Sequence, residues 1–344
     1  MARFYGFEKI GENLLNALRN RKLHHCYLIQ GIRGIGKSSF AQNIASVILS
    51  ARGDGNEPDN SEIEKTAGLI SSGGHTDFML LNLATAEDDG GENTSKREEI
   101  NVKQVRRATL HLRLTQSISN SRVMLVDSID SVNTNGQNAL LKILEEPPAD
   151  TYIFLVCHNP GKVLATVKSR CSVVNVPDPT FDSWKMALQD VWQKNPRQNN
   201  YGGNLENLYN LSGHSIGLAL DIISRDAQKI YENLLENIFV GNIISIQKFA
   251  ENIAQENLFS LFKIFLDKFF SDIIKYCLGE HDAMDGEYVD TNRMTVFLEK
   301  NQMEKILKKY DYSRKMLRNA ELYNLDKKHC ISVLLGKISQ GGTI

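Results

Sequence analysis

The stretch CYLIQGIRGIGKSSFAQNIASVIL, residues 26–49, decides the fold of this chain. An apolar run with strand character leads into a glycine-rich turn, and an amphipathic helical pattern follows the turn. The turn fills the pattern G-x-x-x-x-G-K-[ST] and carries one further glycine inside it: Gly31, Gly36, Lys37 and Ser38, with Gly34 in the middle. A strand, a glycine loop and a helix in this order predict a phosphate-binding loop, the alternative being a tight strand-to-helix turn.

Each residue type in this loop suits a bound polyphosphate. Glycines let the backbone turn its N–H groups inward around the anion, and the following helix points its positive end at the same place. Lys37 supplies a mobile positive charge, and the hydroxyl of Ser38 is placed to bind Mg²⁺. We therefore predict a site for ATP or ADP with Mg²⁺, formed by Gly31, Gly34, Gly36, Lys37, Ser38 and the adjacent Ser39.

A second part of this site is predicted at residues 121–130, SRVMLVDSID. The apolar run indicates a buried parallel strand, and Asp127 at its carboxyl end stands where a carboxylate holds Mg²⁺ through water. Many ATPases with this loop carry a glutamate base at the next position, where this chain has Ser128. Because losing a general base removes roughly 10² to 10⁴ in rate, we expect nucleotide binding with weak or absent hydrolysis.

Strands and helices alternate through the first half of the chain. Apolar runs predict further strands at residues 77–83, 151–157 and 172–176, and helical periodicity predicts helices at residues 10–21, 102–114 and 135–146. This alternation after a phosphate-binding loop predicts an α/β domain with a parallel, doubly wound sheet, whose ligand lies at the carboxyl ends of the strands.

The remaining periodic segments are all helical, and they follow the punctuation Pro177-Asp178-Pro179. We expect helices at residues 184–193, 205–210, 213–224, 227–239, 244–255, 258–277, 296–317 and 326–338. The predicted organisation is a nucleotide-binding domain (residues 1–177), a small helical lid domain (residues 178–226) and an all-α C-terminal domain (residues 227–344).

Composition narrows the class of protein. Lys and Arg total 40 against 41 for Asp and Glu, so any contact with DNA must be local. The five cysteines are scattered without a C-x-x-C pair, which argues against a disulfide framework and a zinc site and favours a reducing cytoplasm. The N-terminus has no signal-peptide pattern. Charges interrupt the most apolar stretch, residues 258–277, so we expect a bundle helix and no membrane contact.

Two further segments carry a family resemblance. The block NALLKILEEPP at residues 138–148, followed after one strand by Ser169-Arg170-Cys171, resembles the AAA+ clamp-loader subunits of bacterial DNA polymerase III. Within that family the chain is most similar to the delta-prime branch. Ser128 replaces the glutamate of gamma/tau-like subunits, residues 212–220 lack the sensor-2 arginine, and residues 51–78 lack the cysteines of a zinc module.

The resemblance implies specific roles and partners. Arg170 matches an arginine finger that reaches in trans into the ATP site of a neighbouring subunit, where such a residue is worth roughly 10³ to 10⁵ in rate. A sensor-1 residue is expected among Cys157, His158 and Asn159. The implied partners are gamma/tau-like and delta-like subunits, the sliding clamp and, through the complex, primed DNA. The alternatives are a self-sufficient gamma-like ATPase motor and a small-molecule kinase, which would leave the helical third unexplained.

The helical third has a local charge excess. Residues 293–328 contain ten Lys or Arg and five Asp or Glu, a balance of +5. One interpretation is a solvated helix face. The other is a collar in which subunits associate, with basic residues on the rim and apolar side chains burying against neighbours or against the chain's own core: Phe297, Leu298, Ile306, Leu307 and Leu317.

Overall fold

The computed structural model describes residues 5–51, 58–84, 99–113, 116–194, 201–256, 258–279 and 291–339. The chain forms two compact units. The first contains Met1–Gln189 together with Ser215–Gly217, and the second contains Asp190–His214 and Leu218–Ile344. The expected division of the helical part into a lid domain and a collar domain stays a prediction.

A five-stranded parallel sheet forms the centre of the first unit, as predicted. Its strands are β1 (Cys26–Gln30), β2 (Phe78–Asn82), β3 (Arg122–Asp127), β4 (Thr151–Cys157) and β5 (Ser172–Asn175). They lie in the order β2-β3-β4-β1-β5. The strand that leads into the glycine loop therefore lies between β4 and β5, deep in the sheet, where its first four residues are buried.

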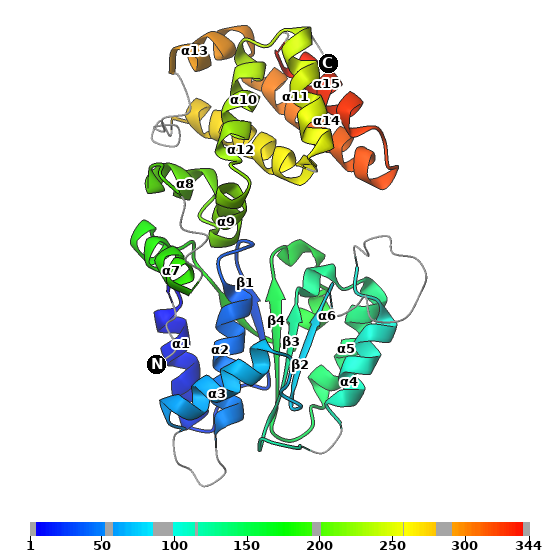
Figure 1. The fold of residues 1–344 in the computed structure, drawn as a ribbon. Helices are drawn as coiled ribbons and strands as arrows, with labels where there is room; N and C mark the ends of the chain where they lie inside the picture. Colours follow the sequence, from blue (N-terminus) through cyan, green and yellow to red (C-terminus); the bar gives the residue numbers. More distant parts are fainter. Residues whose placement is uncertain are drawn as a thin grey trace. The chain divides into compact units, whose positions relative to one another are not determined.

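Helices cover both faces of this sheet (Figure 1). On one face lie α1 (Glu8–Arg19), α2 (Lys37–Ser50) and α3 (Asn60–Ser71), and on the other lie α4 (Val102–His111), α5 (Thr134–Glu145) and α6 (Ala165–Lys168). Side chains of β1 alternate between the two cores: Tyr27 and Ile29 pack under α2, whereas Cys26 and Leu28 pack under α5. Short 3₁₀ turns follow β3 (Ile129–Ser131) and β4 (Pro160–Lys162).

The helix α3 was not expected, because residues 51–61 are polar and rich in turn formers. Its start is explained by Asp59, whose side chain accepts a hydrogen bond from the backbone N–H of Glu62 at 2.8 Å. Such an N-cap supplies one of the acceptors that a helix start lacks, and typically stabilises the helix by about 1 kcal/mol.

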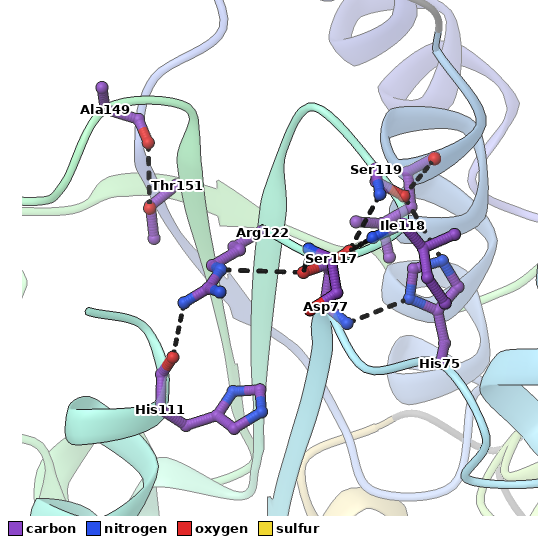
Figure 2. Close-up of polar contacts among 10 residues, drawn as sticks. His75, Asp77, His111, Ser117, Ile118, Ser119, Arg122, Ala149 and Thr151 are labelled. Carbon is purple, nitrogen blue, oxygen red and sulfur yellow. Dashed lines mark hydrogen bonds and ion pairs between the residues drawn. The ribbon is translucent and has the colours of Figure 1, made fainter. Parts of the chain in front are cut away.

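A buried charge network joins the amino ends of β2 and β3 (Figure 2). The carboxylate of Asp77 accepts the backbone N–H groups of Ser117, Ile118 and Ser119 at 2.9, 2.7 and 2.9 Å. Arg122 places its Nε 3.7 Å from Asp77 Oδ1 and donates from Nη1 to the carbonyl of His111 at 2.6 Å. Burial alone would raise the pKa of Asp77, but these hydrogen bonds and the guanidinium lower it below its ordinary value.

The second unit is helical. It contains α8 (Leu205–Leu211), most of α9 (Ile216–Ser224), α10 (Gln228–Phe239), α11 (Ile243–Gln255), α12 (Phe259–Cys277), α13 (Thr291–Lys300), α14 (Met303–Leu322) and α15 (Lys327–Ser339). The helix α7 (Phe181–Lys194) crosses the boundary between the units. Phenylalanines of α12 fill the core, where Phe269 meets Phe239 and Phe297 in edge-to-face contacts. No helix in the described residues is long and apolar enough to cross a membrane.

The single helix expected at residues 296–317 is wrong, because the chain breaks between α13 and α14. The buried Asn301 donates its side-chain amide to the carbonyl of Phe297 at 2.9 Å and accepts from Nζ of Lys309 at 2.8 Å. Gln302 then takes an extended backbone as the N-cap of α14. The side-chain amide of a buried asparagine thus satisfies one of the last carbonyls of α13, which the apolar period does not reveal.

Candidate functional site

The glycine loop lies at the carboxyl end of β1, at the edge where the strand pattern placed it. The N–H of Gly31 donates to the carbonyl of Cys157 at 3.3 Å, which ties the loop to β4. Gly34 and Gly36 have φ values of 81° and 96°, a region that costs a residue with a side chain, and Gly36 is the N-cap of α2. The loop therefore needs glycine at both positions.

Lys37 is almost completely buried at the base of this loop, with 2% of its surface exposed. Its ammonium donates to the carbonyl oxygen of Gly31 at 2.7 Å and also to that of Ile32. Burial lowers the pKa of Lys37 to about 8, against the opposing attraction of Asp127. Among the described residues no carboxylate is hydrogen-bonded to this ammonium, so the loop holds a buried cation whose bonded partners are neutral.

The acidic side of the site lies at the carboxyl end of β3. Asp127 pairs in register with Val156 of β4, which brings the residue after β4, His158, beside it. Nε2 of His158 lies 3.9 Å from Oδ1 of Asp127, and the backbone N–H of His158 donates to Asp130 at 2.9 Å. The pKa of His158 is lowered, first by burial and then by the charge of Lys37.

Asp130 was not singled out from the sequence. It lies in the quoted strand segment three residues after Asp127, and this spacing is the signal that could have found it. Among the three sensor-1 candidates, His158 is the one whose side chain approaches Asp127. Cys157 is buried within β4, and Asn159 accepts the N–H of Gly161 as the cap of a 3₁₀ turn.

Ser128 takes no part in the polar edge of this site. Its side chain is buried, and its hydroxyl pairs with that of Ser131 at 3.0 Å. A hydroxyl in this position is not a base near neutral pH. Ser128 therefore cannot act as the general base that the glutamate supplies in many related ATPases.

Ser38 and Ser39 occupy the first turn of α2, half-buried and exposed respectively. The hydroxyl of Ser38 and the carboxylate of Asp127 supply the kind of oxygen ligands that Mg²⁺ accepts. Mg²⁺ binds through one or two protein oxygens, substrate phosphates and water, so this donor set fits the ion. Among the described residues no group of three or more His, Cys, Asp and Glu side chains is arranged to hold a metal by itself.

The segment expected to replace sensor 2 contacts the loop directly within the first unit. The N–H of Gly217 donates to the carbonyl of Gly34 at 3.0 Å. A Cβ at Gly34 would lie 2.1 Å from the hydroxyl of Ser215, so this close approach also requires glycine. This segment therefore contacts the loop through a backbone N–H, and residues 212–220 contain no arginine or lysine.

Arg170 lies on the turn between α6 and β5, and its guanidinium is held by this chain. Nε and Nη2 both donate to Oε1 of Glu145 at the end of α5, at 2.9 and 2.5 Å. Nη1 donates to the carbonyl of Thr166 at 2.8 Å. The side chain remains one-third exposed, so it is ordered without being buried.

Strand register separates Arg170 from the glycine loop. Tyr27 pairs with Ser172 near the amino end of β1, whereas the loop begins after Gln30 at the carboxyl end. Three residues of strand span about 10 Å, and Arg170 precedes Ser172 on the far side of that interval. The loop and Asp127 thus lie together at the carboxyl ends of the strands, whereas Arg170 lies at the amino ends.

Comparison with known proteins identifies relatives that match half of this chain or most of it. A family profile described as "DNA polymerase III, delta subunit" matches residues 6–180. DNA polymerase III subunit delta prime of Pseudomonas aeruginosa is 29% identical over 321 residues, which cover 90% of this chain and 91% of that protein. The tau subunit of Bacillus subtilis is 31% identical over 166 residues, which cover 48% of this chain and 27% of that protein.

Proposed function

We propose that this delta-prime-like subunit takes part in loading the sliding clamp on primed DNA. The proposal starts from the family: the chain belongs to the delta-subunit family of DNA polymerase III. In this proposal it associates with gamma/tau-like and delta-like subunits and acts on a neighbour's ATP site through Arg170. The similarity to a delta-prime subunit over nine tenths of both chains favours this role.

The position of Arg170 carries the proposal. Its guanidinium lies at the sheet edge opposite its own glycine loop, so it is badly placed to serve the chain's own nucleotide. The ion pair with Glu145 fixes the guanidinium in one orientation on the surface. A preoriented guanidinium that meets a developing phosphate charge stabilises it without the cost of reorganisation.

The chain's own site is proposed to bind ATP or ADP with Mg²⁺ and to turn it over slowly. The ammonium of Lys37 exchanges the carbonyls of Gly31 and Ile32 for phosphate oxygens, and the loop supplies backbone N–H groups. Mg²⁺, when bound, neutralises phosphate charge beside Ser38 and Asp127. With the hydroxyl of Ser128 paired to Ser131, no described side chain at that position is placed to activate water.

Reconstitution with partner subunits tests the arginine role. Arg170→Ala should lower the steady-state ATPase of the loader at the site that receives this residue by at least 10²-fold. Arg113→Ala, at an exposed arginine beyond α4, is the matched control and should leave the rate unchanged. An unaltered ATPase in a fully assembled loader carrying Arg170→Ala would exclude the finger.

The rival function is a gamma-like motor that hydrolyses its own ATP. The intact loop favours it, whereas Ser128 opposes it. The isolated chain distinguishes them: turnover near one per second that Lys37→Ala abolishes indicates the motor, and turnover far below that indicates the delta-prime-like role.

We also propose that the C-terminal helices form the subunit-binding collar. The turn after α10 and the start of α11 expose three large apolar residues, Val240, Ile243 and Ile244, each with more than 60% of its surface accessible. Phe297, Ile306 and Leu317 are instead buried in the chain's own core, and Leu307 is exposed. A neighbouring subunit that covered this patch would bury these apolar side chains, and that burial would stabilise the complex.

Charge insertion tests the collar. Ile243→Glu combined with Ile244→Glu should prevent co-elution with partner subunits while leaving nucleotide affinity unchanged. Leu110→Glu, at an equally exposed position on α4, is the control. A chain ending near residue 226 should likewise fail to assemble. Stoichiometric co-elution of the double variant would remove this turn from the interface.

A further inference from the structure

Two thiols lie in contact at the amino edge of the sheet, away from the glycine loop. Sγ of Cys26, at the first position of β1, is 3.2 Å from Sγ of Cys171, which directly precedes β5. Both are free cysteines. We propose that Cys26 and Cys171 form a redox-active dithiol that a hydroperoxide converts into a disulfide.

The strand register makes the bond feasible. Tyr27 pairs with Ser172, so Cys26 and Cys171 stand opposite each other one step earlier along the same two parallel strands. Neighbouring strands lie about 4.8 Å apart, within the Cα separation that a disulfide spans. Both side chains belong to the same core under α5 and α6, so their sulfur atoms already face one another.

The two thiols have different environments, which assigns their roles. Cys26 is fully buried, whereas Cys171 is half-buried and is the one that a small oxidant can reach. The thiol of Cys171 donates to the carbonyl of Val167 at 3.1 Å, which leaves the proton of Cys26 to point at the sulfur of Cys171. Receiving that hydrogen bond lowers the pKa of Cys171, and donating it raises the pKa of Cys26.

The chemistry follows this asymmetry. The thiolate of Cys171 attacks one oxygen of hydrogen peroxide, the O–O bond breaks, and the leaving hydroxide becomes water by taking up the proton that the thiol released, so Cys171 becomes a sulfenic acid. Cys26 then attacks that sulfur, the S–O bond breaks, and the leaving hydroxide takes the proton of Cys26 as a second water. Two thiols lose two electrons in total, and the peroxide gains them. A dithiol reductant reverses the reaction.

One consequence rests on the proposed function. Cys171 follows Arg170, and forming the bond removes the hydrogen bond from the Cys171 thiol to Val167, which adds to the backbone hydrogen bonds of the turn carrying the arginine. We therefore expect the oxidised chain to support a lower ATPase in its neighbour, and Cys171→Ser to make that ATPase insensitive to peroxide. Bond formation itself depends only on the sheet and survives if Arg170 has no role in trans.

Peptide mapping of the full chain under non-reducing conditions tests the bond. A Cys277→Ser background removes an exposed thiol of α12. With one equivalent of hydrogen peroxide the chain should lose two titratable thiols, lose about 2 Da, and yield one linked pair of peptides containing Cys26 and Cys171. Dithiothreitol should restore both thiols.

Variants separate this pair from unspecific oxidation. Cys157 lies in β4 on the same face of the sheet, paired with Gln30, four residues beyond Cys26 along β1. Cys157→Ser should therefore still give the link. Cys26→Ser should instead leave a sulfenic acid at Cys171, which dimedone traps. The proposal is overturned if peroxide oxidises Cys277 in the unmodified chain but leaves Cys26 and Cys171 as thiols, or if Cys26 links equally to Cys157.

Discussion

Charged side chains are buried at both ends of the parallel strands, here called the amino edge and the carboxyl edge of the sheet, but their partners differ. At the amino edge, Asp77 is matched by three backbone N–H groups and by Arg122, so a negative group and a positive group are buried together. At the carboxyl edge, Lys37 is equally buried but donates to two carbonyls. The first arrangement pairs opposite charges within the chain, whereas the second gains from an anion, which is why we assign structure to the amino ends of the strands and binding to their carboxyl ends.

Loss of charge at the amino edge should give the largest effect. Asp77→Asn leaves the buried guanidinium of Arg122 without its anion, and such a change costs about 3 to 5 kcal/mol of unfolding free energy. Asp182→Asn, on the exposed start of α7, should cost less than about 0.5 kcal/mol. Urea denaturation measures both. A cost below about 1 kcal/mol for Asp77→Asn would show that the amino edge is not a structural ion pair.

Loss of charge at the carboxyl edge should have the opposite sign. The pKa of Lys37 falls from 10.5 to about 8 on folding, a difference that corresponds to roughly 3 kcal/mol against the charged form. Lys37→Met should therefore be more stable than the natural chain at pH 7 by about 1 to 3 kcal/mol, a gain held below the full difference because the carbonyls of Gly31 and Ile32 lose their donor. The exposed Lys142→Met is the control.

The same lysine gives a pH test. Because its folded pKa is lowered, the penalty is fully present below pH 8 and is relieved as the pH rises from about 8 toward 10.5. The stability advantage of Lys37→Met should therefore shrink over that range in urea denaturation. An advantage that grows with pH would mean that the ammonium is stabilised by folding, as at a structural ion pair.

A smaller effect is expected in acid. The folded pKa of Asp77 lies below its ordinary 3.8, so its contribution is present above that value and is lost as the pH falls through the folded pKa. The natural chain should lose stability relative to Asp77→Asn only below about pH 4. Unfolding curves at pH 7, 4.5 and 3 measure this difference. A difference already falling between pH 7 and 4.5 would assign the transition to another group.

The sequence predicted those features that repeat or follow a local pattern. Alternating apolar runs gave the parallel α/β sheet, and the glycine spacing placed Lys37 at the carboxyl end of β1. Helix α3 was not predicted, because its start depends on a single cap at Asp59. The break before α14 was not predicted either, because it depends on Asn301, whose partner Lys309 lies eight residues away.

Contacts between distant segments were beyond reach of the sequence. The resemblance singled out Arg170, but its pairing with Glu145 depends on how α5 and α6 pack. His158 could not be chosen over its two neighbours until the register of β3 and β4 placed it beside Asp127. The sequence analysis gave Asp77 no role of its own, because its hydrogen-bond donors come from a loop forty residues later.

Titration of the isolated chain with a fluorescent ATP analogue in Mg²⁺ tests the assignment of the carboxyl edge most directly. We predict saturable binding to the natural chain, at least tenfold weaker binding to Lys37→Met, and unchanged affinity in the folded fraction of Asp77→Asn. Phosphate release by the natural chain should stay far below one per second. Absence of binding at millimolar nucleotide, or equal affinity of the natural chain and Lys37→Met, would contradict the account.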